Sequence, residues 1–351
     1  MKYVALLSGG KDSCYNLVHC ARHGHELVAA ATLGPEQGKG IELDSYLYQT
    51  VGQDAIKFVA QALDVPLFRR VIVGTAVEQG AEYGGRNASD PPVNKDDETE
   101  DLYALLAQVK SEHPDVQGVS VGAILSSYQR VRVEHVCRRL GLTPLCYLWQ
   151  RDQSELLSEM VEAGMEAIII KVAGIGLTTK HLGKTLAQMQ PTLTKLNTLY
   201  GSHVCGEGGE YETLTLDCPL FKYRITLLET ETVIHSDSDF ATVAFLRIKS
   251  ARLDRKDIAT VSAAVPDLLD AEFSDVEKAL ISSSRHSEEQ ERLPDLKTEA
   301  RTVPLGPSVR RDGNWLALAD IQRENTTPEQ GPSVEDEVRE CFQMLHSNFH
   351  P

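Results

Sequence analysis

The sequence has 351 residues, of which 42% are hydrophobic, so it is long enough for two domains or for one large domain with an appendage. It has no apolar run of the roughly 18 residues that a membrane span needs, and its N-terminus lacks the basic and apolar regions of a signal peptide, so we expect no membrane partner. Acidic residues outnumber basic ones by 51 to 35, and a net charge of −16 disfavours direct binding of nucleic acid.

The seven cysteines are odd in number and form no C-x-x-C pair. This pattern argues against a disulfide framework, a zinc ribbon and an iron–sulfur site. It is typical of a protein from a reducing compartment, and we therefore expect a cytoplasmic localisation.

An apolar stretch of strand length, Tyr3–Leu7, opens the chain, and a helix-compatible stretch covers Cys14–Ala21. A strand, a glycine turn and a helix N-terminus together make an anion site, because the first helical N–H groups have no intrahelical partner. Lys11 adds a positive charge, whereas Asp12 would repel phosphates unless Mg²⁺ lies between; its alternative role is the helix N-cap. The turn between the two stretches consists of Ser8, Gly9, Gly10, Lys11, Asp12 and Ser13.

Strands and helices are expected to alternate over the first 150 residues. This alternation predicts an α/β fold with a parallel sheet, in which ligands bind at the carboxyl ends of the strands. Thr32, Gly122, Ala123 and Ile124 stand at such ends and are expected to face a nucleotide. Strands are predicted at Tyr3–Leu7, Leu27–Leu33, Leu67–Val73, Val116–Ile124 and Pro144–Leu148, helices at Asp54–Leu63, Thr99–His113 and Ser127–Leu140, and a mobile loop at Gly80–Asp97.

The same alternation is expected to continue after Asp152. The composition changes beyond Pro219, where strands follow one another, and residues 282–300 read as a linker or disordered segment. Helices are predicted at Asp152–Ala163, at His181–Leu199 with a kink or break at Pro191, and at Glu335–Asn348; strands are predicted at Ala167–Val172, Thr213–Leu216, Phe221–Ile234 and Ala241–Lys249, and a strand or hairpin at Gly306–Asp320.

The hexapeptide at residues 8–13 resembles the pyrophosphate loop of the N-type ATP pyrophosphatases. Four further blocks stand at Glu98–Leu102, at Gly122–Ile124 with Ser126 and Tyr128–Glu134, at Pro144–Gln153, and at Gly206–Thr213 with Leu216–Pro219. With these blocks the chain resembles the diphthine–ammonia ligases over about residues 1–225, with one departure at Tyr147, where the family often has a proline. The resemblance implies a cytoplasmic, ATP- and Mg²⁺-dependent amidation of diphthine on elongation factor 2 by ammonium, which yields diphthamide, AMP and pyrophosphate.

The resemblance also implies roles for individual residues. The loop 8–13 with Thr32 and Gly122–Ile124 would bind ATP, Asp12 would contact the metal, and Lys11, Asp12, Glu207 and Glu210 would take part in catalysis. Substrate binding is expected from Gln129, Arg130, Arg132, Glu134, Trp149, Gly206, Gly208, Gly209, Tyr211 and Glu212.

The acidic side chains and Tyr211 of the loop 206–213 suit the trimethylammonium group of diphthine, and one of its glutamates would alternatively hold ammonium. Arg130 and Glu134 would alternatively form a surface ion pair. His19, His23 and His25 match no metal motif and are expected to be solvated.

Four segments are expected: a pyrophosphate-loop domain at 1–130, a substrate-binding subdomain at 131–235, strands and linker at 236–301, and a partial domain resembling the Rid (YjgF-like) imine deaminases at 302–351. Two other functions remain open: a tRNA-modifying ligase or thiolase, and a nucleotide-binding protein without catalysis. The tRNA-modifying enzyme would want a basic surface and, for sulfur transfer, usually a cysteine pair, and the sequence has neither. A glutamine-dependent amidotransferase would need a glutaminase nucleophile motif, and no convincing one is visible, so free ammonium is the simpler nitrogen source.

Overall fold

The computed structural model describes residues 1–35, 52–78, 80, 83, 96–237 and 242–256, together with the backbone of 308–312 and 315–319. The chain divides into two units, Met1–Asp270 and Ala271–Pro351. Among the helices of these described ranges, none is long and apolar enough to cross a membrane. The six cysteines in them, all except Cys341, are free thiols.

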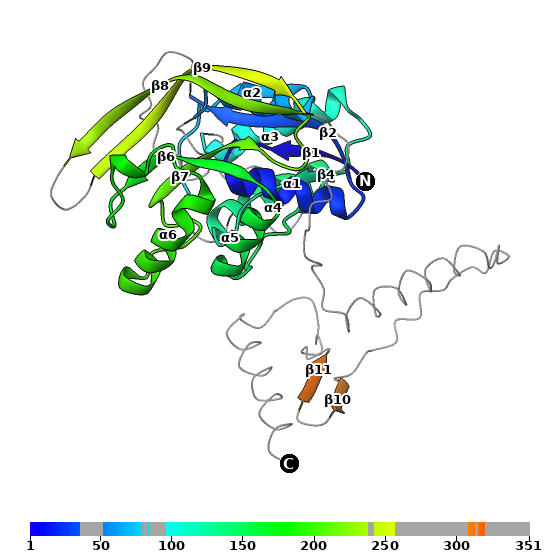
Figure 1. Ribbon diagram of the computed structural model, residues 1–351. Coiled ribbons are helices and arrows are strands. Elements are labelled where there is room, and N and C mark those ends of the chain that lie inside the picture. Colours follow the sequence, from blue (N-terminus) through cyan, green and yellow to red (C-terminus); the bar gives the residue numbers. More distant parts are fainter. Residues whose placement is uncertain are drawn as a thin grey trace, which may run out of the picture. The chain divides into compact units, whose positions relative to one another are not determined.

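A five-stranded parallel sheet lies at the centre of the first unit, as the strand–helix alternation predicts (Figure 1). The strand order is β3-β2-β1-β4-β5, so neighbours on either side of β1 are reached by crossovers in opposite directions. Such a reversal creates the crevice in which α/β proteins bind ligands. The strands are β1 (Lys2–Leu6), β2 (Glu26–Gly34), β3 (Leu67–Val71), β4 (Gly118–Ser120) and β5 (Thr143–Leu145).

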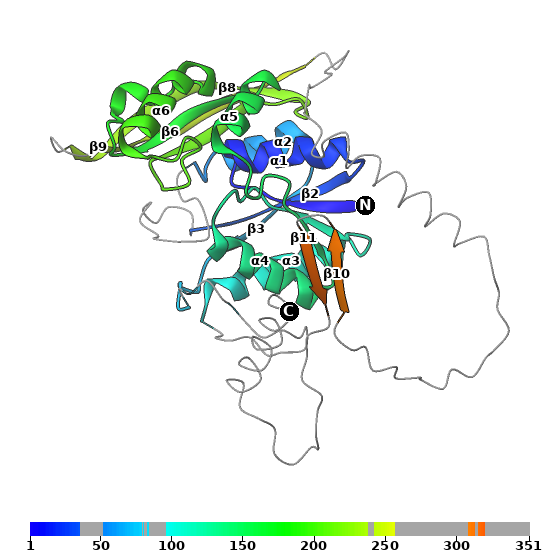
Figure 2. The same cartoon turned by 90° about the horizontal axis from the view of Figure 1, so that it is seen from below.

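Helices cover both faces of this sheet (Figure 2). Because side chains alternate along a strand, Tyr3 and Ala5 of β1 pack with α1 and α2, whereas Val4 packs with α3 and α4. The two resulting cores explain why the strands are apolar on both sides. The helices are α1 (Lys11–Arg22), α2 (Ile56–Leu63), α3 (Glu98–Glu112) and α4 (Ser127–Leu140).

A second sheet, which is antiparallel, lies against α1 and α2 (Figure 2). The expectation that the parallel pattern continues past Asp152 is therefore wrong, because β6 pairs with the returning strands β7 and β9. The order is β7-β6-β9-β8, with β6 (Glu166–Ala173), β7 (Tyr211–Asp217), β8 (Tyr223–Asp237) and β9 (Thr242–Arg255).

Helices α5 (Gln153–Glu162) and α6 (Leu186–Tyr200) pack on this second sheet. Helix α6 begins later than predicted, because Thr185 and Gln188 form a capping box that fixes its start. Residues Thr179–His181 instead form a separate 3₁₀ turn, η1. The helix is continuous through Pro191.

In the second unit, β10 (Ser308–Asp312) and β11 (Trp315–Ala319) pair as an antiparallel hairpin, which confirms the hairpin predicted in residues 306–320. The predicted linker at 282–300, the predicted helix at 335–348 and most of the predicted loop at 80–97 lie outside the described residues.

Candidate active site

A cavity of about 590 Å³ opens at the carboxyl ends of β1, β2 and β4, where β7 and the loop before it close one side. A volume of this size is typical of a nucleotide or cofactor site. Its wall consists of Leu6, Leu7, Ser8, Lys11, Asp12, Ser13, Ala31, Thr32, Leu33, Gln53, Val121, Gly122, Ala123, Ser126, Tyr128, Gln129, Val133, Cys205, Gly206, Glu207, Gly209, Tyr211, Glu212 and Thr213.

The glycine turn at the start of α1 is held by its own hydroxyl groups. Gly9 adopts φ +81°, a left-handed conformation that favours glycine. The Ser8 hydroxyl accepts from the Gly10 N–H at 3.2 Å and donates to the Ser13 hydroxyl at 3.1 Å. Gly10 is the helix N-cap and Asp12 lies within the first turn, so Asp12 does not cap the helix.

The turn is also held from both sides by distant parts of the chain. The Lys11 N–H donates to the Thr213 hydroxyl at 3.0 Å, and the Thr215 N–H donates to the Gly9 carbonyl at 2.8 Å. On the opposite side a Cβ on Gly122 would come within 2.5 Å of the Ser13 backbone nitrogen. Strand β7 of the second sheet therefore helps to hold the turn at residues 8–13 in place.

The Lys11 side chain is buried, at 3% exposure, although it lines the cavity. Its ammonium donates to Asp12 Oδ2 at 2.7 Å and to the Cys205 carbonyl, and it lies 5.2 Å from the centre of the Tyr211 ring. Burial acts to lower the pKa of Lys11, but Asp12, Tyr211 and Cys205 together outweigh it, and the pKa is above its usual value. Lys11 is a fixed positive charge.

Asp12 is the residue that fits a divalent cation. Its Oδ1 atom is buried without a hydrogen-bond partner among the described residues. Burial raises the pKa of Asp12, the Lys11 ammonium opposes this rise, and the Glu207 carboxylate adds to it. The described residues contain no group of three or more potential metal ligands. One or two carboxylates suffice for a Mg²⁺ ion that phosphates also hold.

The three glutamates in and after the glycine-rich loop before β7 each contact a different partner. Glu207 lines the cavity and accepts from the Leu125 N–H at 3.0 Å. Glu210 lies outside the cavity wall and accepts from the His203 N–H at 2.7 Å. Glu212 lines the cavity but pairs with Lys171 at 2.7 Å. Of the three glutamates, Glu207 and Glu212 therefore reach the cavity.

The rest of this loop is arranged around its backbone. Tyr211 donates to the Val204 carbonyl at 2.7 Å, and its ring faces Lys11. Gly206 and Gly209 line the cavity, whereas a Cβ on Gly208 would come within 2.7 Å of the Glu210 carboxylate. Gly208 therefore leaves room for the Glu210 side chain.

Arg132, at the centre of α4, is fully buried. Its guanidinium stacks on Tyr128 at 3.3 Å and on Tyr83 at 4.9 Å from the ring centres. It donates to the backbone carbonyls of Tyr128, Gly80 and Glu78. Arg132 lies outside the cavity wall and acts as an internal anchor between α4 and the segment after β3.

Of the other residues predicted on α4, one lines the cavity and two form an ion pair. Gln129 lines the cavity. Arg130 pairs with Glu134 at 3.3 Å and covers the half-buried Trp149 ring at 4.7 Å, so the surface pair suggested by their spacing is present. Ile124 is fully buried outside the wall, next to Ala123 within it.

Several wall residues were absent from the predicted set. Ser126 and Tyr128 belong to a block that resembles the family, and the Tyr128 hydroxyl donates to the buried Glu98 at 3.0 Å. Thr213 ends the glycine-rich block, so its position carried a signal. Gln53 and the apolar ends of β1 and β2 carry no motif, and only the fold places them here.

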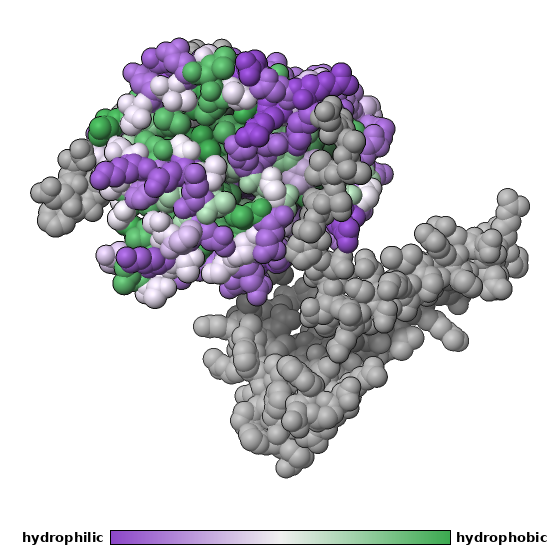
Figure 3. All heavy atoms as spheres, in the orientation of Figure 1, coloured by the Kyte–Doolittle hydropathy of each residue, from purple (hydrophilic) through white to green (hydrophobic). Residues whose placement is uncertain are grey.

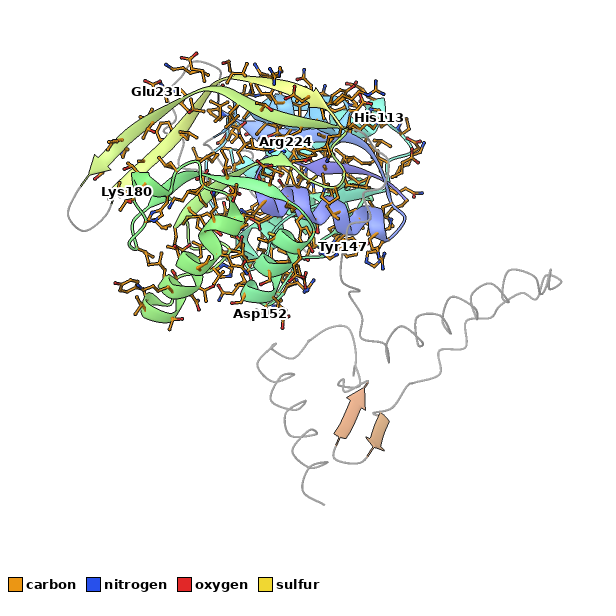
Figure 4. All side chains as sticks on the ribbon, viewed as in Figure 1. His113, Tyr147, Asp152, Lys180, Arg224 and Glu231 are labelled. Carbon is orange, nitrogen blue, oxygen red and sulfur yellow. The ribbon has the colours of Figure 1, made fainter. Side chains whose placement is uncertain are left out.

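The expectation of solvated histidines is wrong for His19, which is fully buried on α1. Its ring packs edge-on against Tyr15 at 4.8 Å and lies 6.1 Å from Tyr147, which Figure 4 labels. Burial, together with the charge of Arg151, lowers the pKa of His19 to about 4. His23 stacks on the same Tyr147 ring at 4.6 Å.

Comparison with known proteins places the chain in a family. A model described as the diphthamide synthase N-terminal domain matches residues 1–144, and one described as the diphthamide synthase C-terminal domain matches residues 152–251. The chain belongs to the diphthamide synthase family. This confirms the resemblance seen in the motifs. The boundary between the two matched domains lies at the connection between β5 and α5. The Rid-like segment lies beyond both models and stays a prediction.

Named relatives agree with this assignment. The chain is 56% identical to the diphthine–ammonia ligase of Rattus norvegicus over 73% of this chain and 94% of that protein. It is 53% identical to the human diphthine–ammonia ligase over 76% of this chain and 96% of that protein. The Schizosaccharomyces pombe diphthine–ammonia ligase is 47% identical over 92% of this chain, which spans only 52% of that protein. By their name, these relatives are ligases that form a C–N bond.

A solved structure, a predicted subunit of tRNA methyltransferase from Methanocaldococcus jannaschii, matches 56% of this chain at 14% identity with a TM-score of 0.27. A similarity this low supports no inference about function.

Proposed function

We propose that this chain is a diphthine–ammonia ligase that amidates diphthine on elongation factor 2 with ammonium and ATP. The observation that carries the proposal is the cavity in which the α1 N-terminus, Lys11 and Asp12 meet the glycine-rich loop before β7. The α1 N-terminus makes one end of this cavity suited to an anion, and the loop before β7 makes the other end acidic. Such a cavity suits the activity for which the diphthamide synthase family is named.

The chemistry requires activation of the substrate carboxylate, because ammonia is too weak a nucleophile toward an anion. In the proposed first step a diphthine carboxylate oxygen attacks the α-phosphorus of ATP, and the bond to pyrophosphate breaks. In the second step the ammonia nitrogen attacks the acyl carbon, AMP leaves, and one proton is released. The products are diphthamide, AMP and pyrophosphate.

The residues of the turn suit the first step by position and charge. Lys11 is held in place by Asp12 and the Cys205 carbonyl, so its positive charge does not need to reorganise when pyrophosphate leaves. Magnesium, held by Asp12 and the phosphates, would supply further positive charge. Thr32 and the strand ends beside it offer an apolar wall suited to the nucleoside.

Glu207 is the residue of the acidic loop that we assign to the cationic group of diphthine. It lines the cavity, and its described contact is a single backbone N–H. Tyr211 and Trp149, which the sequence suggested as aromatic walls, already face the cations of Lys11 and Arg130. Negative charge, rather than an aromatic cage, would therefore recognise the trimethylammonium group.

The test is to incubate the full chain with ATP, ¹⁵N-labelled ammonium and elongation factor 2 bearing diphthine, and to measure AMP, pyrophosphate and label in the protein. Stoichiometric AMP and amide nitrogen are expected. ADP and orthophosphate in their place would refute adenylation, and nucleotide binding without turnover would favour a non-catalytic protein. Glutamine in place of ammonium and a transfer-RNA substrate test the other two alternatives.

A further inference from the structure

A strained turn follows β6 on the surface of the first unit. Gly174, Ile175 and Gly176 have φ values of +79°, +51° and +76°, and the Leu177 N–H donates to the Gly174 carbonyl at 3.0 Å. Two central residues with positive φ define a type I′ turn, which favours glycine, asparagine and aspartate. A β-branched residue in this conformation is a marked outlier, because its Cβ crowds the neighbouring backbone.

The core does not offset the strain at Ile175. Its side chain remains 38% exposed, whereas that of Leu177, two residues later, is 2% exposed and belongs to the core. The left-handed backbone of Ile175 and its exposed apolar side chain each disfavour the folded state. Such a residue points to a contact outside the chain.

The turn lies next to the loop of the candidate active site. The Ala173 N–H, directly before the turn, donates to the Glu210 carbonyl at 2.9 Å, and both neighbours of Glu210 line the cavity. The Gly174 N–H donates to the Thr242 carbonyl at 3.0 Å, and Thr242 is the first residue of β9, at the turn end of the hairpin of β8 and β9. Figure 3 shows hydrophobic and hydrophilic residues mixed at the end of the molecule where this hairpin projects.

The connection that follows Ile175 carries two lysines in a chain whose net charge is −16. Lys180 and Lys184, on the same connection, are exposed and form no ion pair with the described residues. Burial and the charges of these lysines lower the pKa of His181 between them. Figure 4 shows Lys180 at the end of the molecule from which the hairpin projects.

We propose that Ile175 and Lys180 form a docking edge for the protein substrate, which presents an apolar recess beside carboxylate side chains. This inference rests on the proposed function, which requires a macromolecule to bring one side chain into the cavity. Contact with Ile175 buries exposed apolar surface, and carboxylates of the substrate pair with Lys180. The turn then positions the substrate against the acidic loop through Ala173 and Glu210.

The test compares variants of the full chain in the AMP-forming reaction, with wild-type activity measured first. Ile175→Asn relieves the strain, so the melting temperature should rise by about 3 °C. The same change should raise the KM for modified elongation factor 2 about tenfold, while the dissociation constant for ATP is unchanged. Ile175→Val keeps the apolar contact and should keep the wild-type KM.

Two further variants separate docking from general effects. Leu199→Asn removes an apolar side chain at the end of α6 that is even more exposed, at 56%, and should leave the KM unchanged. Lys180→Glu should raise the KM at low salt, and this effect should shrink at high salt.

A KM for Ile175→Asn equal to that of the wild type, or an equal rise for Leu199→Asn, would overturn the docking edge while leaving the ligase proposal intact. An inactive wild-type chain would overturn the ligase proposal and the docking edge with it.

Discussion

Replacing Lys11 by methionine removes the buried ammonium and keeps most of its apolar stem. In the structure the Lys11 side chain is 3% exposed, and its ammonium is shared between Asp12, at 2.7 Å, and the Cys205 carbonyl. The variant leaves both acceptors without their donor. The variant should therefore lose stability as well as activity. Replacement of a solvent-exposed loop lysine would, by contrast, lower activity alone.

The magnitude follows from burial. Removing one partner of a fully buried ion pair costs about 3–5 kcal/mol. The Asp12 side chain is 23% exposed and can recruit water, so we expect a smaller loss for Lys11→Met. An unfolding free energy lower by about 2 kcal/mol is the expected value. Loss of a preorganised charge beside the leaving group should slow AMP formation about a hundredfold or more.

The assay is urea unfolding at neutral pH together with AMP release under saturating substrates. Lys171→Met is the matched control, because its ammonium also lies 2.7 Å from a carboxylate, that of Glu212, but is 29% exposed. An ion pair that solvent reaches should contribute less than about 1 kcal/mol. A double-mutant cycle with Asp12→Asn should then show a coupling energy of more than about 1 kcal/mol for the Lys11 pair.

The reasoning fails if Lys11→Met and Lys171→Met lose the same stability, since burial would then not govern the cost. It also fails if AMP release by Lys11→Met stays within about threefold of the wild type, which corresponds to roughly 0.7 kcal/mol of barrier.

Three other outcomes are expected. Thr213→Val removes the acceptor of the Lys11 N–H and should lower AMP release about tenfold, Thr213→Ser should restore it, and equal rates for both would refute this role. Gly122→Ala should cost about 2 kcal/mol in urea unfolding, because its Cβ would lie 2.5 Å from backbone. Gly24→Ala meets no atom within 4 Å, so only its φ of +71° opposes the change and it should cost about 1 kcal/mol; equal losses would contradict this. The pKa of His19 is lowered from 6.5 to about 4, so its contribution is present above pH 6.5 and is lost as the pH falls toward 4. Melting curves should show that His19→Phe loses less stability than the wild type between pH 7 and pH 4, by up to about 3 kcal/mol, and an unchanged pH profile would refute this role of His19.

Local sequence determined the parallel half of the fold and the anion-binding end of the site. Apolar runs of strand length, separated by helical periodicity, predicted β1 to β5 and their helices. The hexapeptide at residues 8–13 predicted the turn and the start of α1, because glycine conformation and unpaired N–H groups are properties of neighbouring residues. The hairpin of β10 and β11 was visible in the sequence for the same reason.

The partners of each side chain were decided only by tertiary structure. A buried strand such as β6 has the same pattern in either kind of sheet, and only its neighbours β7 and β9 make this one antiparallel. Arg132 and Arg130 look alike in sequence, but two tyrosines and three backbone carbonyls enclose Arg132, whereas Arg130 lies over Trp149. Thr213 reaches the Lys11 N–H across 202 residues of chain, and no local pattern encodes a hydrogen bond between such distant segments.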